Sequence, residues 1–174
     1  MKGRGCFAVV QLRGTPDNAA DNPLSARHPQ EKTMTPDTPP NNNNDDPLDI
    51  LNSRQLPSLL MQAEPRQVVT ANKQARELFH KGLSEIENLR GGQVFDCIHS
   101  FTEKGCGLDE NCEDCKIKGA VVDTFASGNP HNNVETVLDI KKQDMPTTPY
   151  AMIVSTEKVG DFVLITVLKY DEKP

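Results

Sequence analysis

The chain changes composition abruptly near residue 50, and this break limits how much of it can fold. Seven of the 13 prolines lie within the first 47 residues, beside the polar run 41–46. Between residues 11 and 50, apolar residues are sparse and follow neither the strand period nor the helix period. Such a segment cannot bury enough surface to offset its chain entropy. We therefore expect residues 1–50 to be a disordered tail and residues 51–174 to form one domain.

Met34 opens the part of this tail that is richest in proline and asparagine. It is a candidate start codon, and in that case residues 1–33 are not translated. The apolar stretch 6–10 is shorter than the apolar core of a secretory signal, and no run approaches the length of a membrane span. We therefore expect a cytoplasmic protein with no membrane partner.

The charge balance is acidic, with 19 Lys and Arg against 25 Asp and Glu. Nucleic-acid binding needs a basic surface that neutralises phosphates, so we expect no nucleic-acid partner. In the reducing cytoplasm, cysteines bind metal or react more often than they form disulfides. The five cysteines of this chain are therefore candidates for chemistry.

The start of the domain has the pattern of two strands followed by a helix. Residues 56–61 and 66–70 have the composition of short strands. Asn72 stands where it can cap a helix over 73–79, and Gly82 follows where a glycine would end that helix.

A second helix is expected over 114–125, and the period then changes to that of strands. The expected strands of the last third are 134–140, 150–156 and 162–170, the last two joined by a turn at 158–161. Two strands, several short helices and a three-stranded meander fit an antiparallel sheet with short helices packed on one face. The predicted fold class is therefore α+β.

This order of elements and two stretches of sequence resemble a PAS domain. The stretches are Val-Val-Thr-Ala-Asn-Lys-Gln-Ala at 68–75, with Asn72 where PAS sequences commonly carry asparagine, and Val-Leu-Lys-Tyr-Asp at 167–171. Residues 91–98 and the cysteines after them are similar to a bacterial subgroup that carries a Cys-Gly…Cys-x-x-Cys cluster before its long helix. The resemblance covers residues 54–172.

The resemblance implies a sensory or protein-interaction module in signal transduction, not an enzyme. PAS domains hold a ligand or cofactor between sheet and helices and relay a change to a partner. No kinase, cyclase or DNA-binding domain follows in this sequence. We therefore expect output through a separate protein, such as a signalling kinase or regulator. PAS domains often pair through the exposed side of the last hairpin, so a homodimer is expected as well.

Four cysteines are clustered in the loop 97–115. Cys97, Cys106, Cys112 and Cys115 have the spacing C-x8-C-x5-C-x2-C, and the last pair has the spacing of a metal knuckle. Four thiolates suit tetrahedral zinc or an iron–sulfur cluster, because soft sulfur ligands select these over hard cations. The sequence predicts a metal site, with zinc as first choice, and His99 is a candidate to replace one cysteine.

Two other functions remain open from the residues alone. Cys112 and Cys115 could cycle between dithiol and disulfide, which would make the chain a redox switch. The domain could also be a ligand-free dimerisation scaffold. The carboxylates Asp123, Glu135 and Asp139 stand in no recognisable nucleophilic or acid–base spacing, so we expect no enzyme.

Apolar residues of the second helix and the last three strands are candidates for the lining of a small-molecule pocket; otherwise they are simply core. They are Ile117, Val121, Val122, Phe125, Val137, Leu138, Ile153 and Leu164.

Overall fold

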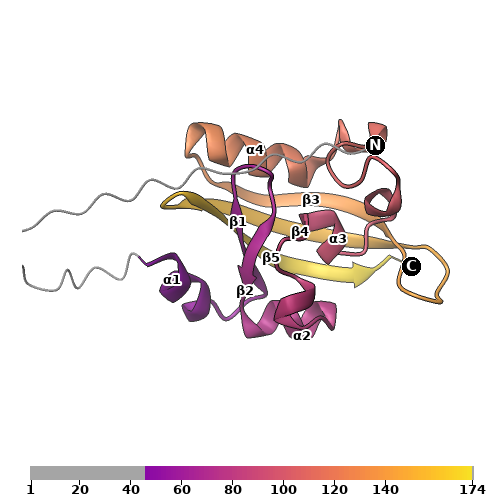
Figure 1. The fold of residues 1–174 in the computed structure, drawn as a ribbon, viewed down its shortest axis with the longest axis horizontal. Helices are drawn as coiled ribbons and strands as arrows, with labels where there is room; N and C mark the ends of the chain where they lie inside the picture. Colours follow the sequence, from indigo (N-terminus) through magenta and orange to yellow (C-terminus); the bar gives the residue numbers. More distant parts are fainter. Residues whose placement is uncertain (1–45, 174) are drawn as a thin grey trace, which may run out of the picture. The chain divides into compact units, whose positions relative to one another are not determined.

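The computed structural model describes residues 46–173, which form one antiparallel sheet with helices (Figure 1). The strands are β1 (Ser58–Gln62), β2 (Val68–Ala71), β3 (His131–Ile140), β4 (Thr148–Val159) and β5 (Phe162–Glu172). The α-helices are α1 (Pro47–Ser53), α2 (Lys73–Phe79), α3 (Gly91–Val94) and α4 (Lys116–Ser127). Three short 3₁₀ helices are η1 (Leu83–Glu85), η2 (Ile98–Phe101) and η3 (Glu110–Cys112).

The strands lie in the order β2-β1-β5-β4-β3, and every neighbouring pair is antiparallel. Strands β3, β4 and β5 form the expected meander, and β4 and β5 meet at a tight turn where Val159 pairs with Phe162. All the helices from α2 to α4 lie in the connection between β2 and β3. The predicted α+β class with an antiparallel sheet is confirmed, and the helices from α2 to α4 pack on one face of it as expected.

The main core lies between this helical connection and one face of the sheet. Successive residues of a strand point to opposite faces, and alternate residues of β5, such as Val163, Ile165 and Val167, enter this core. Helix α4 packs Ile117 and Val121 against them. Burial of such side chains stabilises the fold by about 1.5–3 kcal/mol each. This core therefore fixes the position of α4 over the sheet.

A second, smaller cluster lies on the opposite face and holds α1. Leu51 of α1 is 1% exposed and packs with Leu60, Val159 and Leu164. Asp46 caps this helix by accepting from the Leu48 amide at 2.8 Å. The boundary predicted at residue 51 therefore falls inside a helix, because residues 47–50 already belong to α1. Residues 1–45, the rest of the predicted tail with its candidate start at Met34, lie outside the described residues.

The helix after β2 begins as predicted but ends differently. The Asn72 side chain accepts a hydrogen bond from the Ala75 amide at 3.0 Å, which caps α2. The left-handed residue that ends the helix is His80, with φ 52°, and not Gly82. Gly82 instead begins η1, where its amide donates to the Glu85 carboxylate at 2.7 Å. The prediction for Gly82 was wrong by two residues.

Candidate functional site

The four clustered cysteines are positioned by the short helices between α3 and α4. Cys97 directly precedes η2, Cys112 ends η3, and Cys115 is the residue before α4. Cys106 lies in the loop between η2 and η3, flanked by Gly105 and Gly107, whose φ angles are 74° and 80°. Glycine adopts such angles without the strain other residues suffer, so the chain can turn on both sides of this thiol.

All four cysteines line one cavity of about 230 Å³. None of the four forms a disulfide. Part of the wall is apolar, with Met61 from β1, Val121 from α4 and Ile165 from β5. The loop thus brings all four cysteines to the edge of the main core. Sites of this kind, concave and apolar with a few convergent polar groups, are the usual places for ligands.

Cys106 has the most closely defined surroundings. Its sulfur accepts a hydrogen bond from the Gly92 amide at 3.2 Å, and its carbonyl accepts one from Arg90 Nη1 at 2.9 Å. A Cβ placed on Gly92 would lie only 2.6 Å from Cys106 Sγ and 3.6 Å from Cys97 Cβ. Cys106 therefore leaves no room for a side chain at residue 92, whereas Cys97 is at an ordinary contact distance.

Burial favours the protonated thiol at two of these cysteines, Cys97 and Cys106. At Cys97, burial is the largest cause, a hydrogen bond from the His99 amide opposes it and the other three cysteines add to it, and together they raise the pKa to about 11. Burial and the neighbouring thiols likewise raise the pKa of Cys106, against the Gly92 amide and the Arg90 charge. A cation that bound these sulfurs would have to displace their protons.

The four cysteines are suitable ligands for a metal that prefers thiolates, but their sulfurs are not arranged as a coordination shell. Within residues 46–173, no three His, Cys, Asp or Glu side chains are grouped closely enough to hold an ion as they stand. Zinc–sulfur bonds are about 2.3 Å long. A metal held by these cysteines would therefore have to draw their sulfurs together.

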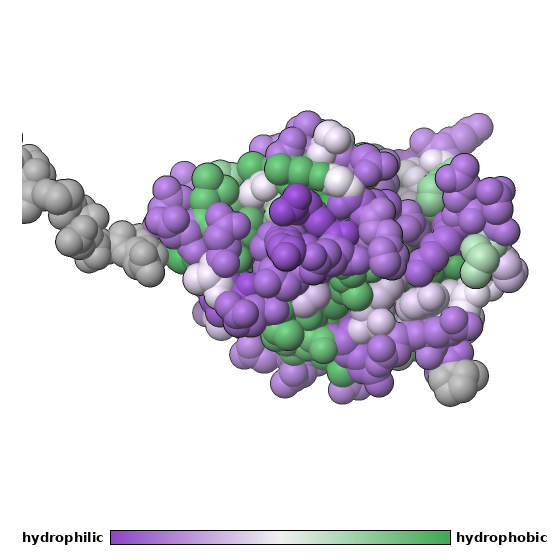
Figure 2. All heavy atoms as spheres, turned by 90° about the horizontal axis from the view of Figure 1, so that it is seen from below, coloured by the Kyte–Doolittle hydropathy of each residue, from purple (hydrophilic) through white to green (hydrophobic). Residues whose placement is uncertain are grey.

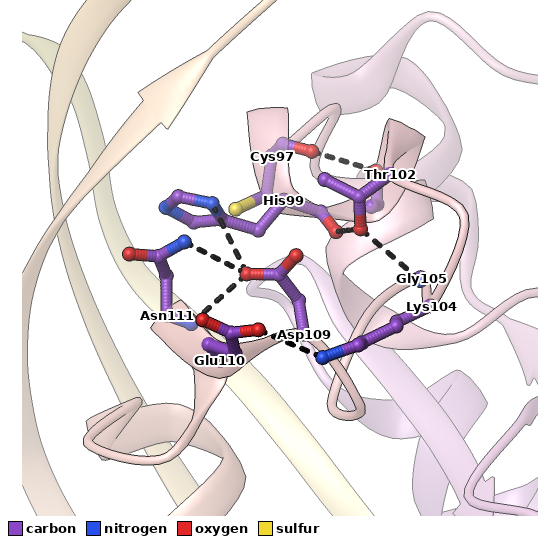
Figure 3. A network of polar contacts seen from close by, with 9 residues as sticks. Cys97, His99, Thr102, Lys104, Gly105, Asp109, Glu110 and Asn111 are labelled. Atoms are coloured by element: carbon purple, nitrogen blue, oxygen red, sulfur yellow. Dashed lines mark hydrogen bonds and ion pairs between the residues drawn. The ribbon is translucent and has the colours of Figure 1, made fainter.

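His99, the candidate replacement ligand, lines the same cavity. Its Nδ1 lies 3.7 Å from Asp109 Oδ1 (Figure 3). That carboxylate oxygen also accepts from the amide and the side chain of Asn111, both at 2.9 Å. These hydrogen bonds, together with one involving Thr102 and the charge of His99, lower the pKa of Asp109. Asp109 thus lies beside one nitrogen of His99, at a distance longer than a hydrogen bond.

The predicted lining residues divide between this cavity and other places. Ile117, Val121 and Leu138 line the cavity, and Val137, which is 48% exposed, borders both this cavity and a second depression on the sheet. Phe125 packs against the main core at the far end of α4, and Val122 is 41% exposed. Ile153 lines a separate depression with Lys169, and Leu164 belongs to the second cluster under α1. Odd and even residues of a strand face opposite ways, which explains why Leu164 and Ile165 separate.

The sequence analysis did not identify two arginines in the wall, Arg66 and Arg90. Arg66 lies in the turn before β2, and Arg90 directly precedes α3. No periodicity marks either residue, because neither lies inside a helix or strand. The only available signal was that Arg90 precedes the Gly91-Gly92 pair next to the first clustered cysteine.

The described chain has the element order that the resemblance implied, with two strands, a helical connection and a three-stranded meander in one antiparallel sheet. The fold is PAS-like. No family model and no curated protein matches the sequence.

Solved structures similar to this PAS-like chain include a LOV protein of Rhodobacter sphaeroides and the PAS domain of nitrogen regulation protein NR(II) from Vibrio parahaemolyticus. The LOV protein is 12% identical with a TM-score of 0.46, and the match covers 69% of this chain and 62% of that chain. The Vibrio domain is 15% identical with a TM-score of 0.42, and the match covers 69% and 94%. The chain thus spans less than two thirds of the LOV protein. At these values, neither structure indicates what this chain binds.

None of the helices within residues 46–173 has the length and apolar character needed to cross a membrane.

Proposed function

We propose that this chain is a sensory and interaction module of signal transduction whose cysteine-lined cavity binds zinc or an iron–sulfur cluster. The output passes to a separate protein, such as a signalling kinase or regulator. The proposal assigns no reaction to the chain: the bound group is either a structural staple or the sensed element.

The observation that carries this proposal is the convergence of Cys97, Cys106, Cys112 and Cys115 on one cavity without a disulfide among them. Simple core packing would scatter cysteines over hydrophobic faces. The hydrogen bond from the Gly92 amide to the Cys106 sulfur supports the same reading. Such bonds to sulfur tune metal–thiolate centres.

A complete set of four protein thiolates leaves no open coordination position, so zinc here would be structural. An iron–sulfur cluster in the same place would change its charge with oxidation state and so report redox conditions or oxygen. In both cases, binding displaces protons from thiols whose pKa is raised. Affinity should therefore increase with pH across the neutral range.

Pairing of two copies is proposed through the open side of the β3–β4–β5 meander. Val137 and Leu168 are 48% and 40% exposed there, beside the half-buried Ile153. The expectation of a homodimer comes from the PAS resemblance. Light scattering on the purified protein and on Ile153→Glu tests it, with a dimer expected for the first and a monomer for the second.

The experiment that tests the metal proposal is an anaerobic purification followed by elemental analysis and an absorption spectrum. About one zinc per chain without visible colour indicates a structural site. Iron and sulfide with broad absorption near roughly 400 nm indicate a cluster. Absence of both metals from a protein that is stably folded contradicts the proposal.

A thiol redox switch at Cys112 and Cys115 is the second candidate, because the two residues lie one turn apart, with the Cys115 amide 3.4 Å from the Cys112 carbonyl. It predicts a metal-free protein in which this pair reacts rapidly with a thiol reagent and forms a reversible disulfide. A metal-free protein without such reactivity would favour the dimerisation scaffold.

A further inference from the structure

We propose that the same cavity has a site for a small organic carboxylate, which Arg66 and Arg90 hold by its charged group. The site goes beyond the proposed metal function and does not require that a metal be bound. Its evidence is the chemistry of the cavity wall away from the sulfurs.

Arg66 lines the cavity and has no close anionic partner among residues 46–173. Its side chain is 20% exposed, and its Nε is buried without a hydrogen-bond partner. The nearest carboxylate oxygen, Glu64 Oε1, lies 3.5 Å away on a side chain that is 77% exposed. A solvated carboxylate at that distance offsets little of the cost of a buried guanidinium. The site therefore favours an anion that approaches from the cavity.

Arg90 enters the cavity from the neighbouring segment. A bridge between Gln67 and Arg90 holds the two segments together, and Arg66 is the residue before that bridge. Arg90 Nη1 donates to the Cys106 carbonyl at 2.9 Å, which uses one of the five N–H groups of a guanidinium. Two guanidinium groups that are always charged thus line one cavity.

The remaining charges of the wall do not cancel these two. Lys118 is a third cation in the cavity wall. The wall also contains two carboxylates, those of Asp114 and Asp139, and both are exposed to solvent. The lining thus holds three cationic side chains, those of Arg66, Arg90 and Lys118, against two carboxylates that are exposed to solvent. A bound monoanion would balance this excess of cationic side chains.

The size and the rest of the wall define the ligand further. The apolar part includes Phe95, Ile117 and Leu138 in addition to Met61 and Ile165. A cavity of about 150 Å³ suffices for benzene in a protein core, and this cavity has about 230 Å³. A ring or short alkyl chain with one carboxylate would place its apolar part against these residues. Its two oxygens would match the planar fork of a guanidinium.

The test is calorimetric titration of the purified full chain with benzoate, beside benzamide and inorganic phosphate. Benzamide has the same size without the charge, and phosphate has charge without an apolar part. Benzoate should bind at least tenfold more tightly than either, because charged hydrogen bonds to arginine and apolar burial both contribute. Three results would each overturn the assignment: benzamide that binds as tightly as benzoate, phosphate that binds more tightly than benzoate, or no detectable benzoate binding at about 10 mM.

Arg66→Gln and Arg90→Gln are the decisive variants, and Arg54→Gln is their matched control. Arg54 also has a buried Nε without a partner, but it pairs with Glu157 and does not line the cavity. Benzoate affinity should fall about tenfold or more in the first two variants and stay unchanged in the third. An equal loss in all three, or no loss in Arg66→Gln, would contradict the site.

Metal content measured on the same samples separates this proposal from the metal proposal. No hydrogen bond joins Arg66 to a cysteine among the described residues, so Arg66→Gln should retain the metal content of the parent protein. If Arg90→Gln fails to fold because it loses its contact with the Cys106 carbonyl, Arg66→Gln still decides the question. If the protein is metal-free and binds benzoate, the carboxylate site is supported and the metal proposal is refuted.

Discussion

Replacement of Gly92 by alanine tests how tightly the cysteine cavity is assembled. The new Cβ would lie 2.6 Å from Cys106 Sγ and 3.1 Å from Cys106 Cβ. The first distance is shorter than non-bonded carbon and sulfur atoms approach, and the second is tighter than most contacts between carbons. Cys106 cannot simply rotate away, because its sulfur accepts from the Gly92 amide and its carbonyl from Arg90. The loop around Cys106 must shift instead.

The expected cost of this shift is about 1–3 kcal/mol of the free energy of unfolding, as for other added methyl groups in packed regions. Backbone strain contributes nothing, since Gly92 has no positive φ. Urea unfolding followed by circular dichroism measures this cost. Metal content measured on the same sample should fall, because the displaced sulfur is a proposed ligand.

Two other glycines serve as matched controls. A Cβ on the adjacent Gly91 would lie 3.5 Å from the ring of Phe95, an ordinary contact, so Gly91→Ala should change stability by less than Gly92→Ala. A Cβ on Gly119 meets nothing within 4 Å, and this residue is inside α4. Gly119→Ala should therefore stabilise the protein by about 0.5–1 kcal/mol. If Gly92→Ala is as stable as Gly91→Ala and keeps its metal, the described packing of Cys106 is incorrect.

Three further changes test the surrounding fold. Asn72→Ala removes the hydrogen bonds that the Ala75 and Ser58 amides donate, both at 3.0 Å, to a side chain that is 2% exposed. Urea unfolding should show that the free energy of unfolding falls by about 2–4 kcal/mol, and a fall of less than about 1 kcal/mol would contradict this network. Leu51→Ala should lower the free energy of unfolding by about 2–3 kcal/mol, whereas Leu48→Ala, at a residue that is 49% exposed on the same helix, should lower it by less than about 0.5 kcal/mol. Equal effects of the two substitutions would mean that α1 is not part of the domain. Burial, with smaller contributions from Tyr150 and Asp96, raises the pKa of Tyr170 above its ordinary value of 10.0, so stability is retained below that pH and declines as pH rises beyond it. Since the chain has two tyrosines, ultraviolet titration of Tyr150→Phe observes Tyr170 alone, and an ordinary midpoint in the folded protein would refute this burial.

The sequence indicated much of the fold because its patterns are local. The alternation of Val134, Thr136, Leu138 and Ile140 marked β3, and Asn72 marked the start of α2. Helix α1 was missed although Asp46-Pro47 is a standard helix start. Its single buried leucine gives no period in a polar stretch, and only contacts with β1, β4 and β5 stabilise it.

Among the residues that line the cavity, the sequence analysis named the cysteines and not the arginines. Knuckle spacing made Cys112 and Cys115 conspicuous, whereas the approach of Cys97 and Cys106 to them depends on how η2 and η3 fold. Arg66 reaches the cavity only because the turn between β1 and β2 lies beside Arg90. That is a long-range relation with no local signature.

Metal content per chain across a set of cysteine-to-serine variants tests the central claim most directly. Cys6→Ser is the control, since Cys6 lies outside the described residues and outside the cluster. The account predicts about one zinc, or one iron–sulfur cluster, in the parent protein and in Cys6→Ser. It predicts a marked loss in each of Cys97→Ser, Cys106→Ser, Cys112→Ser and Cys115→Ser. A metal-free parent protein, or a metal retained in full by all four cluster variants, would contradict it.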